Sequence, residues 1–238
     1  MPDTLLDIRN LRIEATAYPP GEPPQDIVIV HDVSLRLAKG RVMGLIGESG
    51  AGKSTIGLSA MSYGRGGVRL TGGEVRLNGR EIRLANAATL RSLRGREVTY
   101  VAQSAAAAFN PARRLMEQVI EATLHHGLAS RAEAEKRAVA LFRKLGLPEP
   151  ERFGNRYPHQ VSGGQLQRLA AAMALIGDPK LVIFDEPTTA LDVTTQIEVL
   201  RSIRQMTHIY GCSGIYISHD LAVVSQMADD IIIMKDGR

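Results

Sequence analysis

The chain has 238 residues, 44% of them hydrophobic and 23% charged, which is ordinary for one or two globular domains with a sizeable core. Its net charge of +4, from 29 Lys and Arg against 25 Asp and Glu, suits an anionic ligand but is too small to indicate nucleic acid binding. The lone cysteine, Cys212, excludes an internal disulfide and a cysteine-based metal site. No apolar run approaches the roughly 18 residues of a membrane span, and the N-terminus has no apolar signal core, so we expect a soluble, cytoplasmic protein.

The N-terminal part is predicted to be rich in strands. Residues 5–13 indicate a long strand or a strand pair, and residues 18–24, with four prolines and a glycine, indicate a loop. Residues 63–73 are rich in glycine and arginine and are also predicted to be a loop. A short strand follows and is closed by Asn78-Gly79, a strong hairpin signal.

The pattern with the clearest chemistry is Gly47–Thr55, which fits G-x-x-x-x-G-K-[ST] at every fixed position. An apolar run precedes it and a helix-compatible segment follows, which is the context that a phosphate-binding loop needs. A chance glycine turn is the alternative, and this context argues against it. In such loops the lysine reaches the β- and γ-phosphates and the hydroxyl ligates Mg²⁺, so we expect these roles for Lys53 and Ser54. The residues expected to cradle a nucleoside triphosphate are Gly47, Ser49, Gly50, Ala51, Gly52, Lys53, Ser54 and Thr55.

The middle of the chain has a different character. A buried strand is predicted over residues 98–101, ending near Gln103, and residues 113–176 show no strand pattern. Two apolar stripes with helical spacing occur there, and Ser130 is a good N-cap for the second helix. The α/β pattern then resumes, with strands predicted at 181–184, 215–217 and 231–234, a helix at 193–210 and a short helix from Asp220.

Residues 181–186 form an apolar strand that ends in two carboxylates, Asp185 and Glu186. In phosphate-loop enzymes such a strand lies beside the loop, and its terminal acid holds Mg²⁺. We assign that role to Asp185 and expect Glu186 to orient and deprotonate the attacking water. Two acids at a solvated strand end are the alternative, and the phosphate loop upstream disfavours it.

A further helix is predicted to begin at Ser162-Gly163-Gly164-Gln165. Ser at the cap with Gln three residues later is a capping box, but capping does not explain two glycines, which weaken a helix by about 1 kcal/mol each. Glycines there suit the close approach of a phosphate to bare amides. A second anion site in one chain would bind either a second nucleotide or the opposite side of a nucleotide that another site also holds.

These residues, together with Val161, resemble the signature motif of ATP-binding-cassette (ABC) ATPases, with Val in place of the usual Leu. The resemblance implies that Gln103 is the Q-loop glutamine, which senses Mg²⁺ and relays to membrane subunits. It also implies that Asp192 is the D-loop aspartate, which crosses to the partner subunit, and that His219 is the switch histidine on the γ-phosphate. The expected metal ligands are then Ser54, Gln103 and Asp185, and the expected catalytic residues are Lys53, Gln103, Glu186 and His219.

The resemblance covers nearly the whole chain and implies an α/β fold. We expect a RecA-like P-loop NTPase core with an antiparallel β-subdomain over residues 1–103 and 179–238, and an inserted α-helical signature subdomain over 104–178. ATP and Mg²⁺ are the implied substrate and cofactor. The implied partners are a second ABC ATPase domain, integral membrane permease subunits and, indirectly, a solute-binding protein, with no nucleic acid. The protein would then be peripheral on the inner face of the plasma membrane.

Asn110-Pro111, Tyr157–Gln160 and Asp185–Val193 resemble the dipeptide, oligopeptide and nickel importer branch. The first hypothesis is therefore an importer ATPase that closes head to tail with a second cassette around two ATP and drives uptake of a peptide. The alternative is a soluble ABC ATPase of DNA repair or translation, although no long heptad insertion separates the motifs. A solitary phosphate-loop kinase or GTPase is the third, and the signature stretch argues against it.

Some features depart from the family or stay open. The family stacks adenine on an aromatic near the end of the first strands, where this chain has Ala15, and Tyr18 is the candidate replacement. Branch members continue past the last strand, whereas this sequence stops at Arg238, so we expect a trimmed protein or one half of a tandem. A solvated loop is expected for Arg91, Arg94 and Arg96, and a surface pair rather than a metal site for His125-His126.

The alanines at 105–108 lie where the family meets its membrane subunits. They could form a contact surface or a loop packed on the helical subdomain. We predict that Asp at Ala107 or Phe109 uncouples transport and leaves ATP hydrolysis by the free protein nearly unchanged.

Overall fold

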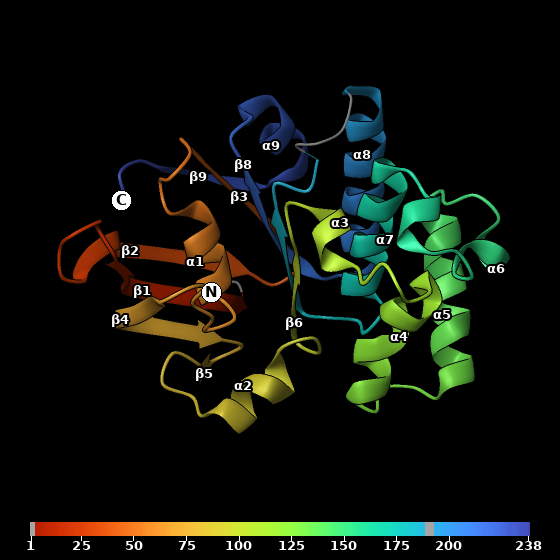
Figure 1. Cartoon of the computed structure of the whole chain (residues 1–238), viewed down its shortest axis with the longest axis horizontal. Helices are drawn as coiled ribbons and strands as arrows, with labels where there is room; N and C mark the ends of the chain where they lie inside the picture. Colours follow the sequence, from red (N-terminus) through yellow and green to blue (C-terminus); the bar gives the residue numbers. More distant parts are fainter. Residues whose placement is uncertain (1–2, 189–192) are drawn as a thin grey trace. The chain divides into compact units, whose positions relative to one another are not determined.

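The computed structural model describes residues 3–188 and 193–238. The chain divides into two compact units: unit 1 comprises residues 1–91 and 215–238, and unit 2 comprises residues 92–214. Figure 1 gives the element labels. The helix α2 (Ala87–Leu93) and the strand β8 (Ser213–Ser218) each run from one unit into the other. Within the described residues, no helix combines the length and the apolar character needed to cross a membrane.

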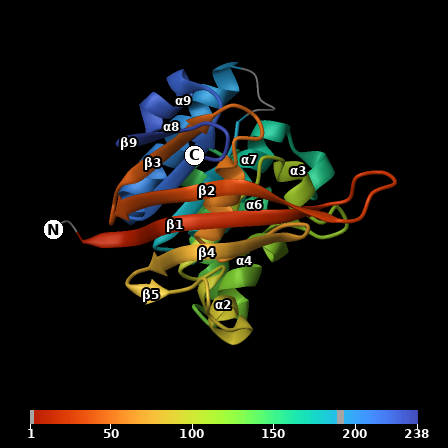
Figure 2. The same cartoon turned by 90° about the vertical axis from the view of Figure 1, so that its left-hand side faces the viewer.

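Unit 1 contains an antiparallel sheet in the order β2-β1-β4-β5 (Figure 2). The first strand extends beyond the predicted residues 5–13 because its far end also pairs with the neighbouring strand, through Ala17 and Gln25. A bulge at Asn10, whose φ is 49°, lets both Ile8 and Leu11 face the core and be fully buried. The strands are β1 (Thr4–Ala17), β2 (Gln25–Ala38), β4 (Val68–Leu77) and β5 (Arg80–Glu81).

The turn between β4 and β5 is the hairpin that Asn78-Gly79 predicts. Both turn residues have positive φ, 50° and 79°, which the tight two-residue turn requires. The predicted loop over residues 63–73 is wrong from Val68 onward, where β4 begins. Pairing with β1 overrides the glycine-rich local sequence. Gly73 is needed within the strand because a Cβ at this position would lie only 2.4 Å from the carbonyl oxygen of Arg9, which is too close.

The second layer of unit 1 is built on two parallel strands, β3 (Val42–Gly47) and β9 (Asp230–Met234). The helix α1 (Lys53–Ser59) follows β3, and α9 (Leu221–Met227) precedes β9. At Gly44 a Cβ would lie 2.2 Å from Cγ1 of Val224, so the glycine lets α9 pack directly against β3. This arrangement is the strand, loop and helix predicted around the phosphate-loop motif.

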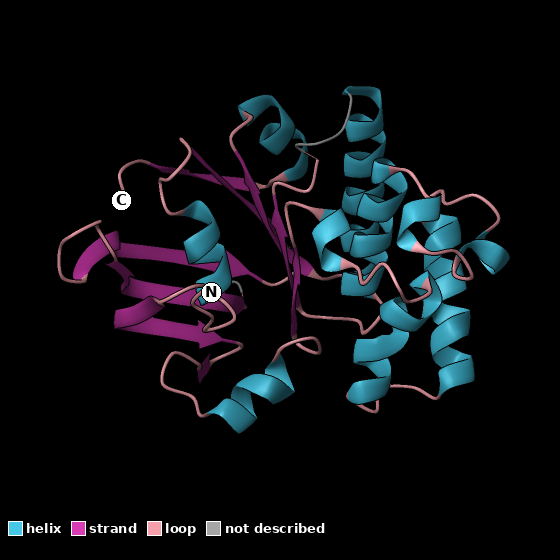
Figure 3. Ribbon diagram, viewed as in Figure 1, coloured by secondary structure: helices cyan, strands magenta, loops and turns pink. Residues whose placement is uncertain are grey.

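Unit 2 pairs the parallel strands β6 (Val98–Val101) and β7 (Leu181–Asp185). The residues between them fold into helices, as predicted (Figure 3). Ser130 caps α5 by accepting a hydrogen bond from the Glu133 amide at 3.3 Å, and Phe142 of the predicted stripe is fully buried against Phe153. The helices of unit 2 are α3 (Ala105–Ala108), α4 (Leu115–His125), α5 (Arg131–Lys144), α6 (Pro150–Phe153), a 3₁₀ turn (Pro158–Gln160), α7 (Gly163–Leu175) and α8 (Val193–Tyr210).

Candidate functional site

The phosphate-loop motif lies between β3 and α1 in unit 1. Its glycines take backbone conformations that L-residues rarely adopt, with φ of 153° at Gly47, 84° at Gly50 and 89° at Gly52. At Gly47 a Cβ would lie 2.1 Å from the carbonyl oxygen of Met234, so no other residue fits there. A Cβ at Gly50 meets nothing within 4 Å, so this glycine serves the loop conformation alone. The loop therefore has the bare, turned backbone that the cradle for an anion requires.

Lys53 begins α1 and is buried, with only 5% of its surface exposed. Its Nζ donates hydrogen bonds of 2.7 Å to the carbonyl oxygens of Gly47 and Glu48. The side chain thus folds back over the loop that it follows, and the ammonium is held at the loop rather than in solvent. This placement puts a positive charge at the predicted phosphate site.

The two predicted carboxylates lie at the end of β7 in unit 2. Asp185 is 6% exposed, and its Oδ2 accepts a hydrogen bond of 2.6 Å from the hydroxyl of Tyr100 on β6. Oε2 of Glu186 accepts one of 3.0 Å from Nε2 of Gln103, just beyond β6. The structure therefore brings Gln103 to the end of β7, where Asp185 and Glu186 lie. It also brings Tyr100 to Asp185, a contact with no signal in the local sequence because only strand pairing creates it.

Glu186 has an unusual backbone, with φ of 44°. The left-handed region is uncommon for residues with long side chains, and Pro187 further restricts the residue before it. Such a conformation costs on the order of 1–3 kcal/mol and persists only where the surrounding structure enforces it. The turn directs the side chains of two adjacent acids to different donors, Tyr100 and Gln103.

The predicted capping box at the start of α7 is present. The backbone N–H of Gln165 donates to Oγ of Ser162 at 3.3 Å, and the backbone N–H of Ser162 donates to Oε1 of the Gln165 side chain at 3.0 Å. Gly163 is exposed in the first turn, whereas Gly164 is buried and its carbonyl accepts from Nε of Arg168 at 3.3 Å. Ser162 and the exposed glycine thus lie at a solvent-facing helix start.

Three further predicted residues lie outside these clusters. His219 is exposed between β8 and α9, next to Asp220, which caps α9 by accepting from the Ala222 amide at 2.8 Å. Tyr18 is 77% exposed in the loop between β1 and β2. Asp192 lies outside the described residues.

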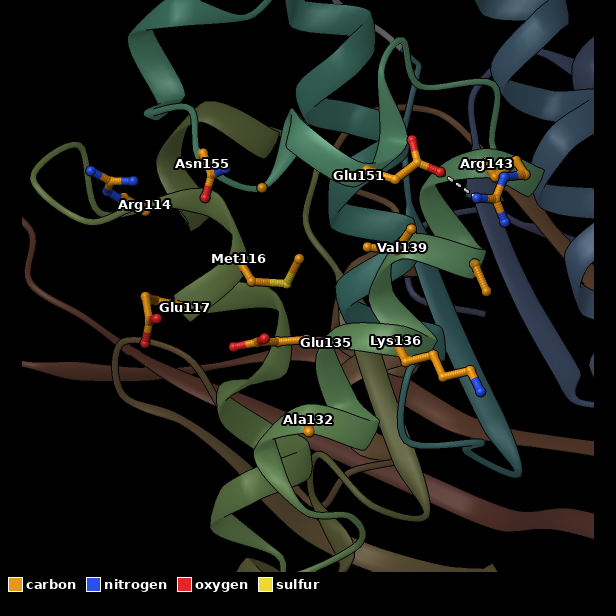
Figure 4. A pocket seen from close by; sticks show the side chains of 12 residues that line it. Arg114, Met116, Glu117, Ala132, Glu135, Lys136, Val139, Arg143, Glu151 and Asn155 are labelled. Carbon is orange, nitrogen blue, oxygen red and sulfur yellow. Dashed lines mark hydrogen bonds and ion pairs between the residues drawn. The ribbon is translucent and has the colours of Figure 1, made fainter.

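A hollow of 640 Å³ opens among α4, α5 and α6, but it contains none of the predicted site residues (Figure 4). Three acidic and three basic side chains line it, and Arg143 forms an ion pair with Glu151. The balance of charge gives it no preference for a phosphate. Its charged lining is Arg114, Glu117, Glu135, Lys136, Arg143 and Glu151.

The histidine pair differs from its prediction in one respect. His125 is exposed, but His126 is half-buried and its Nε2 lies 2.9 Å from the carbonyl oxygen of Arg94. The pair packs edge to face, with ring centroids 5.2 Å apart. His126 therefore joins α4 to the segment before β6, and the described residues contain no cluster of three metal-ligating side chains around it.

Comparison with known proteins supplies the family. A model described as ABC transporter matches residues 30–189. The chain is 36% identical to the probable D,D-dipeptide transport ATP-binding protein DdpD of Escherichia coli (strain K12), over 100% of this chain and 71% of the relative. It is 37% identical to the metal-staphylopine import system ATP-binding protein CntD of Staphylococcus aureus (strain NCTC 8325 / PS 47), over 99% of this chain and 84% of the relative.

Solved structures agree. A dimeric post-hydrolysis state of the ATP-binding cassette MJ0796, bound to ADP and Pi, is 28% identical with a TM-score of 0.83, over 98% of this chain and 95% of that one. The predicted fold class is thereby confirmed as that of ABC ATPases, whose substrate is ATP and whose cofactor is Mg²⁺. The chain belongs to the ABC transporter family and is one of its ATP-hydrolysing cassettes.

Proposed function

We propose that this chain is the ATP-hydrolysing subunit of an importer that takes up a short peptide or a solute of similar size. The observation that carries the proposal is identity of 36–41% to proteins named for the transport or import of dipeptides, oligopeptides and peptides. A relative named for metal-staphylopine import is similar at 37%.

Within the cassette, unit 1 would hold the phosphates through the loop amides and Lys53. The donor set proposed for Mg²⁺ is the Ser54 hydroxyl, the Asp185 carboxylate and the Gln103 amide oxygen. These are all oxygen donors, which Mg²⁺ prefers, and the buried carboxylate of Asp185 suits a cation. Bound Mg²⁺ would neutralise charge on the β- and γ-phosphates.

Glu186 would orient and deprotonate the attacking water, with Gln103 holding its carboxylate in place. His219 would contact the γ-phosphate. Support for these roles comes from the hydrogen bond between Gln103 and Glu186, from the buried carboxylate of Asp185 beside it in the chain, and from the family's chemistry.

We propose that two cassettes act together, since the similar MJ0796 structures are dimeric. Ser162, Gly163, Gly164, Gln165 and Asp192 would then act on nucleotide held by the partner subunit. The exposed capping box supports this, because a solvent-facing helix start can meet another chain. We propose the same subdomain division as above, with the RecA-like core and β-subdomain over 1–103 and 179–238 and the helical subdomain over 104–178.

Membrane permease subunits would bind near Gln103 and place the cassette at the inner face of the plasma membrane, with a solute-binding protein delivering the solute. The alanine helix α3 supports a contact surface there. Ala105 is buried, whereas Ala106, Ala107 and Ala108 are exposed. The prediction that used Phe109 in the same way is corrected, because Phe109 is only 5% exposed and Asp there would disrupt packing.

Nucleotide chemistry is tested with three variants. Lys53→Ala should weaken ATP binding at least about tenfold, because it removes a charge-assisted hydrogen-bond donor, whereas Lys39→Ala, which loses only an exposed ion pair with Asp3, should not. Glu186→Gln should spare ATP binding and abolish turnover. Hydrolysis by the Glu186 variant at the parental rate would refute its role.

Dimerisation is tested by dilution. Activity per chain should rise with protein concentration, and Ser162→Arg should stop hydrolysis while leaving ATP binding to the single chain intact. Full activity at high dilution would contradict the dimer.

The transport role is tested with Ala107→Asp. Hydrolysis by the free protein should stay nearly unchanged, while permease binding and peptide uptake by the assembled importer fall. Equal loss of both would indicate a folding defect, which thermal unfolding reveals. No loss of either would show that α3 is not the coupling surface.

A further inference from the structure

Tyr100 donates a hydrogen bond of 2.6 Å from its hydroxyl to Oδ2 of Asp185. We propose that Tyr100 is a positioning residue, which orients the Asp185 carboxylate for Mg²⁺. The inference rests on the metal role assigned to Asp185 above. It concerns a residue that carries no part of the phosphate-loop, signature or Q-loop patterns.

The register of two parallel strands creates the contact. Tyr100 of β6 lies beside Ile183 of β7, and Asp185 follows two residues later on the same face. Two residues along a strand span about 6.6 Å, and side chains in strands lean along the strand direction. A tyrosine can therefore cross this gap and place its hydroxyl at the carboxylate. Phenylalanine would fill the same space without the donor.

The surroundings make this hydrogen bond important. Asp185 is 6% exposed, and a buried carboxylate is costly unless donors compensate for lost water. The bond is short, as is typical when a hydroxyl donates to an ionised oxygen. Carboxylates that ligate metals are in turn hydrogen-bonded, and loss of such a partner typically lowers metal affinity or activity 10–100-fold.

Each acid of the pair has its own donor from the same stretch of chain. Tyr100 holds Asp185 from within β6, whereas Gln103 holds Glu186 from just beyond it. The two contacts are therefore separable: Tyr100 bears on Asp185 alone, whereas Gln103 donates to Glu186 and is itself a proposed Mg²⁺ ligand. A residue that only packed the strand would affect stability and not the metal requirement.

The experiment compares Tyr100→Phe with the parent protein at varied Mg²⁺. We expect the Mg²⁺ concentration for half-maximal hydrolysis to rise about tenfold. Affinity for ATP in EDTA, which depends on the phosphate loop, should stay unchanged. Direct binding of Mn²⁺ to the ATP complex, measured by electron paramagnetic resonance, should weaken by the same factor as the Mg²⁺ requirement. Tyr210→Phe is the matched control: it removes a hydroxyl elsewhere in unit 2 and keeps the ring beside Lys144.

A double variant, with Tyr100→Phe added to Asp185→Asn, tests whether Tyr100 acts through Asp185. If Tyr100 acts through Asp185, then Tyr100→Phe should add little to the effect of Asp185→Asn on Mn²⁺ binding. Additive effects would overturn the proposal, as would an unchanged metal requirement or an equal loss of ATP affinity in EDTA. Should the phenylalanine variant unfold, Tyr100→Met repeats the test with an unbranched side chain. A parent protein that needs no divalent metal would refute the role of Asp185 itself, whereas a metal-dependent parent matched by Tyr100→Phe would refute only the role of Tyr100.

Discussion

The left-handed backbone of Glu186 predicts an unusual relation between stability and activity. At its φ of 44° a residue with a Cβ is strained by about 1–2 kcal/mol relative to glycine. Glycine is also freer in the unfolded chain, which offsets about 0.4–1 kcal/mol of that gain. Glu186→Gly should therefore be more stable than Glu186→Ala by about 1 kcal/mol, although both lose the same carboxylate.

The Ala and Gly variants are a matched pair, because both also lose the hydrogen bond from Gln103. The difference between them thus isolates the backbone. For a chain of this size, about 1 kcal/mol corresponds to a melting temperature roughly 2–4 °C higher for the glycine variant. Both variants should lose hydrolysis, by about 10²–10⁴-fold if Glu186 acts as the general base.

Thermal unfolding without nucleotide or Mg²⁺ measures the difference, and an ATPase assay on the same samples measures the loss of activity. The control is Ala132→Gly at an exposed position in the first turn of α5, where glycine should destabilise the protein because it gains nothing from a left-handed backbone there. A Glu186→Ala variant as stable as Glu186→Gly, or more stable, would show that the backbone at this position is not strained. The strained turn would then not be a property of the folded chain.

Three other predictions follow from single residues. Tyr18→Ala should weaken ATP binding by about 1 kcal/mol in equilibrium titration if this exposed tyrosine stacks on adenine, and an unchanged affinity would assign the base to another residue or to the partner chain. Gln118→Met should lower the free energy of unfolding, measured in urea, by about 2 kcal/mol. The buried Gln118 side chain accepts a hydrogen bond of 2.7 Å from the backbone N–H of Asn110 and donates to the backbone carbonyls of Asn110 and Arg113, and methionine loses all three bonds. A change below about 0.5 kcal/mol would contradict this. Burial raises the pKa of Cys212 to about 11, so iodoacetamide should label it slowly at pH 9 in the native protein and quickly in urea. The unfolded thiol loses its proton first, so this group should lower stability as the pH rises from about 9 to 11, and rapid native labelling would contradict its burial.

Features that depend only on neighbouring residues could be predicted from the amino-acid sequence. The glycines of the phosphate loop, the Asn78-Gly79 turn and the caps at Ser130 and Ser162 each follow from backbone conformation or from a contact within about four residues. The position of Asp185 and Glu186 at the end of a strand could also be predicted, because a continuous apolar run precedes them. The roles assigned to the site residues remain predictions for the variants above to test.

Contacts between residues far apart in the sequence depend instead on how the strands pair. Tyr100 reaches Asp185 across 85 positions and Gln103 reaches Glu186 across 83, because two parallel strands are paired in one particular register. Pairing with β1 also extended β4 back to Val68, where the local sequence favoured a loop. Periodicity shows that a strand exists, but its partner and register depend on packing summed over the whole sheet, so these contacts could not be read from any local stretch of the chain.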